Sequence, residues 1–256
     1  SYVGYFRRDY SFTNIKNLDV DNYISEMMID YENNMWFASK RSGLLYLSQS
    51  KFKNLNREYG IPENITNTVY KSEGNTYFGT DDGLYILNGD GIHVENEITE
   101  YLKGCSIRDI LRGSDGTMYF ATYRRYGVVM HSPNGDITIF NKAKGAISSL
   151  VNCIYELNDG RIAIGTEDGI SIYDHETQEY VNYGYEDGLE YPNITSLYQD
   201  GNGLIYAGSD GGGLYVIDGE EIKEYTEDDG LNSNVVSSLV YGKDGLWIGT
   251  NNGLSY

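Results

Sequence analysis

The residues best suited to bind a ligand stand in one short loop, Tyr123-Arg124-Arg125-Tyr126. A guanidinium group donates several hydrogen bonds in a planar fork, and a tyrosine ring presents both an apolar face and a hydroxyl group. Arg41 occupies the corresponding place in an earlier copy of the same sequence pattern. Carboxylates occupy it in other copies: Asp81, Asp82, Glu167, Asp168 and Asp210. We expect these side chains to gather on one rim, where they suit a polar ligand such as a sugar. The alternative is a solvated loop with internal ion pairs.

Recognisable catalytic and metal-binding motifs are absent from the sequence. His93, His131 and His175 are scattered, and none has a partner at the spacing of a zinc site. No Gly-x-Ser-x-Gly elbow, phosphate loop or His-Glu-x-x-His occurs. A carboxylate pair for glycoside cleavage is defined by a distance in space, so the sequence leaves that chemistry open. We therefore predict a protein that is not an enzyme and holds no cofactor or metal.

Two acidic connections invite comparison with calcium loops, Glu186-Asp187-Gly188 and Asp228-Asp229-Gly230. Their spacing is not that of an EF-hand. Asp and Gly in such positions also form turns and cap the backbone through side-chain hydrogen bonds. Capping is the favoured interpretation.

The bulk charge limits the classes of partner. The formal net charge is −19, which argues against nucleic acid and against an anionic membrane surface, because both require clustered Lys and Arg. The two cysteines, Cys105 and Cys153, lie in neighbouring repeats at different registers. A disulfide between them is open, but buried free thiols are favoured.

The elements that position these residues come from a repeat, best seen at Leu239–Tyr256. An apolar run leads to a Lys243-Asp244-Gly245 turn, a short strand ending in Gly249-Thr250, a polar pair, and Gly253 opening a new apolar run. The small residue that follows the strand recurs at 38, 79, 121, 165, 208 and 249, in steps of 41, 42, 44, 43 and 41. Six copies in register do not arise by chance.

This period is typical of a β-propeller, in which each repeat folds as a small antiparallel sheet. Sheets that pack face to face bury both faces, which explains the nearly continuous apolar runs. The large residue at the Trp247 position fills the wedge between sheets. The small residue two positions later permits close approach of backbones, and the glycine after the loop suits a left-handed conformation.

We predict an all-β propeller of one domain, residues 1–256, with repeats of about 42 residues starting near 24, 65, 107, 151, 194 and 236. The last repeat lacks its outer strand, and residues 1–18 resemble the back half of a repeat. Those residues supply that strand and close a ring of six blades. The alternatives are seven blades, or an incomplete ring cut from a longer propeller. Neither a signal peptide nor a transmembrane run occurs, but the chain starts without Met and ends in a strand, so it reads as part of a longer protein.

At the level of the repeat, the sequence resembles the two-component regulator propeller family. The segment LWIGTNNGL (246–254) and the lead-in GLNSN (230–234) match its unit closely, and YFGTDDGLYIL (77–87) and IAIGTEDGISIY (162–173) are good copies. The resemblance covers residues 20–256. WD and kelch repeats have different signatures.

The resemblance implies an extracytoplasmic, periplasmic or cell-surface sensor domain of a bacterial signalling protein, which binds a ligand such as an oligosaccharide and acts through a homodimer of the parent protein. It supplies no ligand residues, so the candidates remain Arg41, Tyr123, Arg124, Arg125 and Tyr126. No nucleic-acid partner and no direct membrane insertion are expected. The alternatives are a protein-interaction propeller and a propeller lyase or glycoside hydrolase.

Overall fold

The computed structural model describes residues 4–6, 12–14, 24–31, 34–39, 43–47, 55–243 and 245–256. The chain divides into two compact units, Ser1–Glu58 and Tyr59–Tyr256. Each unit is described by itself. The candidate Arg41 lies outside the described residues.

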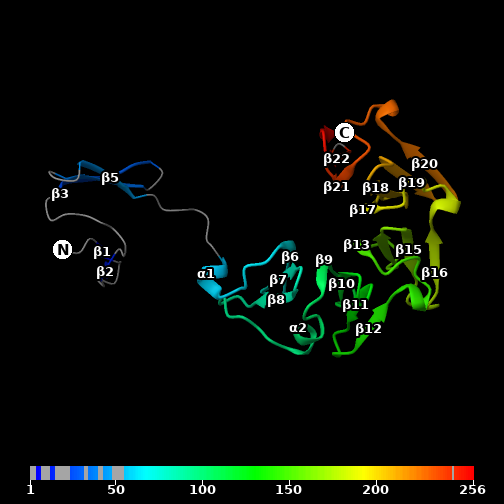
Figure 1. The fold of residues 1–256 in the computed structure, drawn as a ribbon, viewed down its shortest axis with the longest axis horizontal. Coiled ribbons are helices and arrows are strands. Elements are labelled where there is room, and N and C mark those ends of the chain that lie inside the picture. The colour runs from blue at the N-terminus through cyan, green and yellow to red at the C-terminus, as the bar shows by residue number, and fades with distance from the viewer. Residues whose placement is uncertain are drawn as a thin grey trace. The chain divides into compact units, whose positions relative to one another are not determined.

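The second unit is a succession of five antiparallel sheets, each formed by strands that follow one another in sequence (Figure 1). Two sheets have three strands and three have four. The strands are β6 (Thr66–Ser72), β7 (Asn75–Thr80) and β8 (Gly83–Leu87); β9 (Ser106–Arg112), β10 (Met118–Tyr123), β11 (Val128–His131) and β12 (Ile137–Phe140); β13 (Val151–Glu156), β14 (Ile162–Thr166), β15 (Gly169–Tyr173) and β16 (Tyr180–Tyr183); β17 (Ile194–Gln199), β18 (Ile205–Ser209), β19 (Leu214–Asp218) and β20 (Glu221–Tyr225); and β21 (Val236–Tyr241), β22 (Leu246–Thr250) and β23 (Gly253–Ser255).

The first unit contains a sheet of the same kind and a hairpin. The sheet is β3 (Ile24–Ile29), β4 (Met35–Ser39) and β5 (Gly43–Leu47), and the hairpin is β1 (Gly4–Phe6) paired with β2 (Phe12–Asn14). The described residues thus form six sheets of three or four strands, and the fold is an all-β propeller as the repeat predicts.

Helical structure is confined to connections. Helix α1 spans Leu55–Tyr59 and α2 spans Glu97–Tyr101, and three short 3₁₀ turns are η1 (Lys142–Lys144), η2 (Tyr185–Asp187) and η3 (Glu227–Asp229). In the described part of the chain, no helix is long and apolar enough to cross a membrane.

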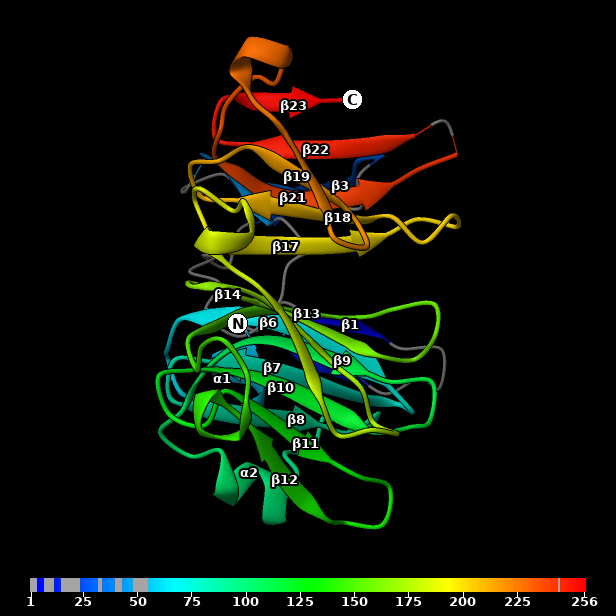
Figure 2. The ribbon, with the colours of Figure 1, turned by 90° about the vertical axis from the view of Figure 1, so that its right-hand side faces the viewer.

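Successive sheets of the second unit lie next to one another (Figures 1 and 2). Apolar side chains fill the seams between them, so the core of this unit is a row of layers. One layer joins the β13–β16 and β17–β20 sheets and includes Ile170, Ile194 and Tyr215, all fully buried. Similar layers lie on both sides of the β9–β12 sheet. Both faces of the middle sheets are therefore buried, as their continuous apolar runs predict.

The small residue at the end of the second strand permits this packing. A Cβ added to Gly165 would lie 2.4 Å from Cys153 Sγ and 2.9 Å from Ile194 Cγ2 of the next sheet. Gly208 stands in the same relation to Val236, at 2.6 Å. At these two positions a larger residue would push adjacent sheets apart.

Side chains of the innermost strands also connect neighbouring sheets. Asn152 Nδ2 donates to Ile194 O at 3.0 Å, and Asn67 Nδ2 donates to Ile107 O at 3.1 Å. These bonds recur at the same repeat position, so they hold the first strands of successive sheets at a constant spacing.

Both cysteines are buried and unpaired, which confirms the favoured prediction of free thiols. Burial raises the pKa of each thiol, so neither is expected to react readily. The single closed domain, the six-blade count and the role of residues 1–18 in closing the ring stay predictions.

Replacing Gly169 by Ala is expected to lower the free energy of unfolding by about 2–4 kcal/mol. Gly169 has φ +136°, and its Cβ would clash with Tyr183 O of the neighbouring strand. The matched control is Gly160→Ala. Gly160 also has a positive φ, +85°, but its Cβ would meet nothing within 4 Å, so only backbone strain of about 1 kcal/mol is expected. Urea unfolding measures both; equal losses would contradict the packing account.

Candidate functional site

The candidate site centres on Tyr123, the last residue of β10. Its ring is half-buried, and its hydroxyl donates to the Glu167 carboxylate of the next sheet. That bond raises the pKa of the Tyr123 hydroxyl, with a contribution from burial. The guanidinium carbons of Arg108 and Arg124 lie 5.0 and 5.2 Å from the ring centroid. We call Arg108, Tyr123, Arg124 and Glu167 the Tyr123 cluster.

The cluster is joined to the preceding sheet through Arg108 on β9. Arg108 Nη1 donates to Asn67 Oδ1 at 3.3 Å. Asp81 accepts hydrogen bonds from Asn67 Nδ2 at 2.9 Å and from Ser106 Oγ at 2.8 Å. These two bonds hold the pKa of Asp81 below its usual value, and the nearby Arg108 charge adds to the effect. Three consecutive sheets therefore contribute to one polar network.

Arg124 adopts a backbone conformation that is unusual for its type. Its φ is +77°, in the left-handed region that costs most non-glycine residues about 1–2 kcal/mol. Its side chain is exposed. The strained backbone places a guanidinium group beside Tyr123 at the surface, whereas a glycine would fit the same turn without strain.

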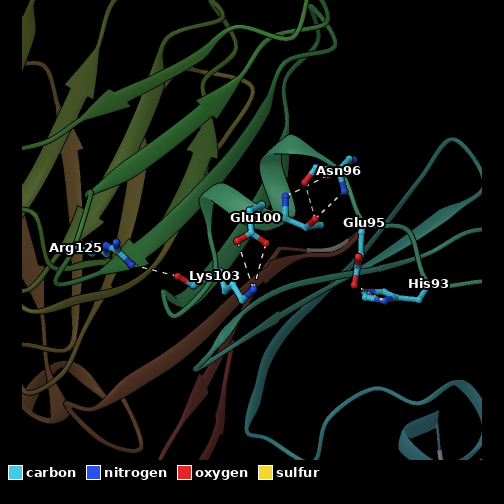
Figure 3. A network of polar contacts seen from close by, with 7 residues as sticks. His93, Glu95, Asn96, Glu100, Lys103 and Arg125 are labelled. Carbon is cyan, nitrogen blue, oxygen red and sulfur yellow. Dashed lines mark hydrogen bonds and ion pairs between the residues drawn. The ribbon is translucent and has the colours of Figure 1, made fainter.

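Arg125 lies near the end of α2 (Figure 3), and Tyr126 also contacts this helix. Arg125 Nη1 donates to Lys103 O at 3.2 Å, and its guanidinium lies 5.0 Å from the Tyr126 ring centroid. Tyr126 stacks on Tyr101 of α2, with centroids 5.0 Å apart. These contacts hold the loop against the connection that contains α2. We therefore infer that Arg125 and Tyr126 position the loop and do not contact the ligand.

The α2 connection is itself held by local polar contacts. Asn96 caps the helix, accepting from Thr99 N at 3.2 Å, and Glu100 pairs with Lys103 Nζ at 3.3 Å (Figure 3). His93 Nδ1 lies 3.9 Å from Glu95. The segment that accepts the Arg125 hydrogen bond is therefore itself held in place by local contacts.

The structure thus divides the loop that the sequence analysis treated as one site. Tyr123 and Arg124 belong to the cluster, while Arg125 and Tyr126 pack against α2. Arg108 was not among the candidates predicted from the sequence. The signal was present, because Arg108 replaces the Asn or Thr found at 67, 152 and 195 in other repeats. A ligand-binding role for these residues stays a prediction.

The acidic connections cap the backbone, in agreement with the favoured interpretation. Asp187 Oδ2 accepts from Gly184 N at 2.8 Å, and Asp229 Oδ2 accepts from Thr226 N at 3.0 Å. Among the residues that the structure describes, no group of three or more His, Cys, Asp or Glu side chains is arranged to hold a metal ion.

Comparison with known proteins identifies the repeat. The model of the two-component regulator propeller family matches residues 230–252, which confirms the resemblance found in the sequence. No curated protein matches the chain.

Solved structures share the fold. The extracellular domain of a putative hybrid two-component system from B. thetaiotaomicron superposes with a TM-score of 0.67 at 20% identity, over 96% of this chain and 35% of that one. Virginiamycin B lyase from Staphylococcus aureus gives 0.61 at 14% identity, over 97% and 84%. PorZ, a surface component of the type-IX secretion system of Porphyromonas gingivalis, gives 0.61 at 16%, over 90% and 38%. This chain thus spans about a third of the length of the B. thetaiotaomicron domain.

Replacing Arg124 by Gly is expected to raise the free energy of unfolding by about 0.5–1 kcal/mol, because the left-handed strain is relieved. Arg125→Gly is the matched control. It removes the bond to Lys103 O and should lower stability by about 1 kcal/mol. Thermal or urea unfolding distinguishes them, and destabilisation by both changes to the same extent would contradict the strain at Arg124.

Replacing Asp81 by Asn is expected to weaken the acid dependence of stability. The pKa of Asp81 is lower in the folded than in the unfolded state, so its contribution is present above the unfolded value, about 3.9, and is lost as the pH falls through the folded value. Urea unfolding between pH 7 and 2.5 should show a smaller loss for the variant. Asp90→Asn, in an exposed turn, is the control. If Asp81→Asn loses as much stability at low pH as the unaltered protein, the lowered pKa of Asp81 would be contradicted.

Proposed function

We propose that this chain, a two-component regulator propeller, is the extracytoplasmic ligand-binding sensor domain of a bacterial signalling protein, and that a polar ligand such as an oligosaccharide binds at the Tyr123 cluster. The domain acts as a receptor and not as an enzyme. The observation that carries the proposal is the convergence of Arg108, Arg124 and Glu167 on one tyrosine ring.

The chemistry of the cluster fits a sugar. Two guanidinium groups supply hydrogen-bond donors to the hydroxyl groups of a sugar, and the Glu167 carboxylate supplies acceptors. The bond from Tyr123 to Glu167 fixes both side chains before a ligand arrives. Less conformational entropy is then lost on binding.

The resemblances support the signalling role. The family model is named for two-component regulators, and one structural neighbour is the extracellular part of a putative hybrid two-component system. Another is a bacterial surface component. A ligand changes the output only if it binds two arrangements of the parent protein with different affinity, for which pairing of two copies provides a route.

The proposal predicts saturable binding of a glycan that depends on the cluster. A thermal-shift screen of the chain against neutral and acidic oligosaccharides should find a ligand that raises the melting temperature by several degrees, since a ligand at 100 times its dissociation constant adds about 2.7 kcal/mol. Arg108→Ala and Arg124→Ala should each weaken its binding by a factor of about 10 to 150, as expected when a charged hydrogen bond of about 1.5–3 kcal/mol is lost.

Lys223→Ala on the outer strand β20 is the control and should bind as the unaltered protein does. If a glycan binds with the same affinity to both arginine variants, its site lies elsewhere. A flat panel with a sharp melting transition would favour docking of a protein partner. Turnover of the glycan would favour a lyase or hydrolase, and either result would overturn the proposal.

A further inference from the structure

A cleft lies at the opposite end of the sheets from the Tyr123 cluster. The cluster stands on the loop after β10, whereas the cleft is lined by turns that precede β10 and β14 and by the turn after β15. Because successive strands are antiparallel, these turns lie at the other end. The cleft has a volume of about 440 Å³, within the range of small-molecule sites.

A pair of rings spans the seam between two sheets inside this cleft. Tyr119 of β10 is 1% exposed, and its hydroxyl lies 2.8 Å from His175 Nε2. His175 belongs to the next sheet, where its ring packs edge-on against Tyr173 at 4.9 Å. The polar pair is therefore fixed on both sides.

The turn that carries His175 is the longest of three corresponding turns. It contains six residues, 174–179, against five between β11 and β12 (132–136) and two between β19 and β20 (219–220). It closes through a hydrogen bond from Asp174 N to Glu179 O, and Gln178 takes a positive φ of +60°. A turn of two residues would complete the sheet equally well, so the repeat does not require the additional residues that bring His175 to Tyr119.

Carboxylates surround the ring pair. Five line the cleft, against one arginine, which is already paired with Asp159 at 2.8 Å. The Glu156 carboxylate is oriented by bonds from Ser114 N at 2.9 Å and Ser114 Oγ at 2.7 Å. Burial raises the pKa of Tyr119, and the charges of Asp115 and Glu156 raise it further. The cleft therefore has a negative potential and aromatic walls.

From the cleft, the ring pair and this excess of carboxylates, we infer a second binding site that takes a small organic cation carrying protonated amines. Carboxylates fixed by backbone bonds accept from ammonium groups without further ordering. The site is independent of the proposed glycan site, since it shares no residue with the Tyr123 cluster.

The test uses putrescine and its neutral isostere butane-1,4-diol, titrated into the whole chain by calorimetry at low salt. Putrescine is expected to bind saturably, and the diol at least tenfold more weakly. The double variant Glu156→Gln and Glu176→Gln should weaken putrescine binding about tenfold. Glu176→Gln alone, at an exposed side chain, should weaken it two- to fivefold.

Glu179→Gln is the matched control, because Glu179 stands in the same turn but does not line the cleft. It should change the affinity less than twofold, and Arg124→Ala should leave it unchanged. No saturable binding of putrescine, equal affinity for the diol, or an equal effect of Glu176→Gln and Glu179→Gln would each overturn the inference. Unfolding curves of each variant confirm that the cleft is intact.

Discussion

The structure depends on one constraint: a sheet of three or four short strands with apolar side chains on both faces is stable only with a neighbour. Each seam between successive sheets in residues 59–256 is filled from both sides, and the glycine at 165 or 208 lets the inner strand of the next sheet approach within contact distance. The strand side chains are therefore needed for packing between sheets. Residues that differ in chemistry from repeat to repeat lie mainly in the turns and loops at the two ends of the sheets.

The two ends have acquired different characters within one acidic chain. On the rim, two arginines flank a tyrosine that is bonded to a carboxylate, and the arrangement suits hydroxyl groups of either donor or acceptor character. At the other end, carboxylates held by turn hydrogen bonds surround a tyrosine–histidine pair. The loop before Gly127 is two residues longer than the loops before Gly83, Gly169 and Gly253, and at the other end a turn of six residues carries His175.

The repeat made the fold predictable, because periodic small residues and glycines report backbone requirements directly. All six glycines that follow the polar loops, from Gly43 to Gly253, have positive φ as predicted.

The site was predicted less completely. Arg108 was missed because it lies on a strand rather than in a loop, and the seam between Tyr119 and His175 joins residues that lie 56 positions apart. Trp247 was expected to fill a wedge but is 42% exposed, since among the described residues of the second unit no further sheet packs against the β21–β23 sheet on that face. Whether Arg125 binds a ligand or holds the loop in place depends on the direction of its side chain, which the spacing of residues in the sequence does not determine.

The central claim is that a ligand is recognised on the rim through Tyr123 and its neighbours. Hydrogen–deuterium exchange with and without a saturating glycan identified by screening tests this claim most directly. The account predicts slower exchange in residues 121–127 and in the adjoining segments around 81 and 167, with the turn at 174–179 unchanged. Protection confined to other segments, with 121–127 exchanging as in the free protein, would contradict it.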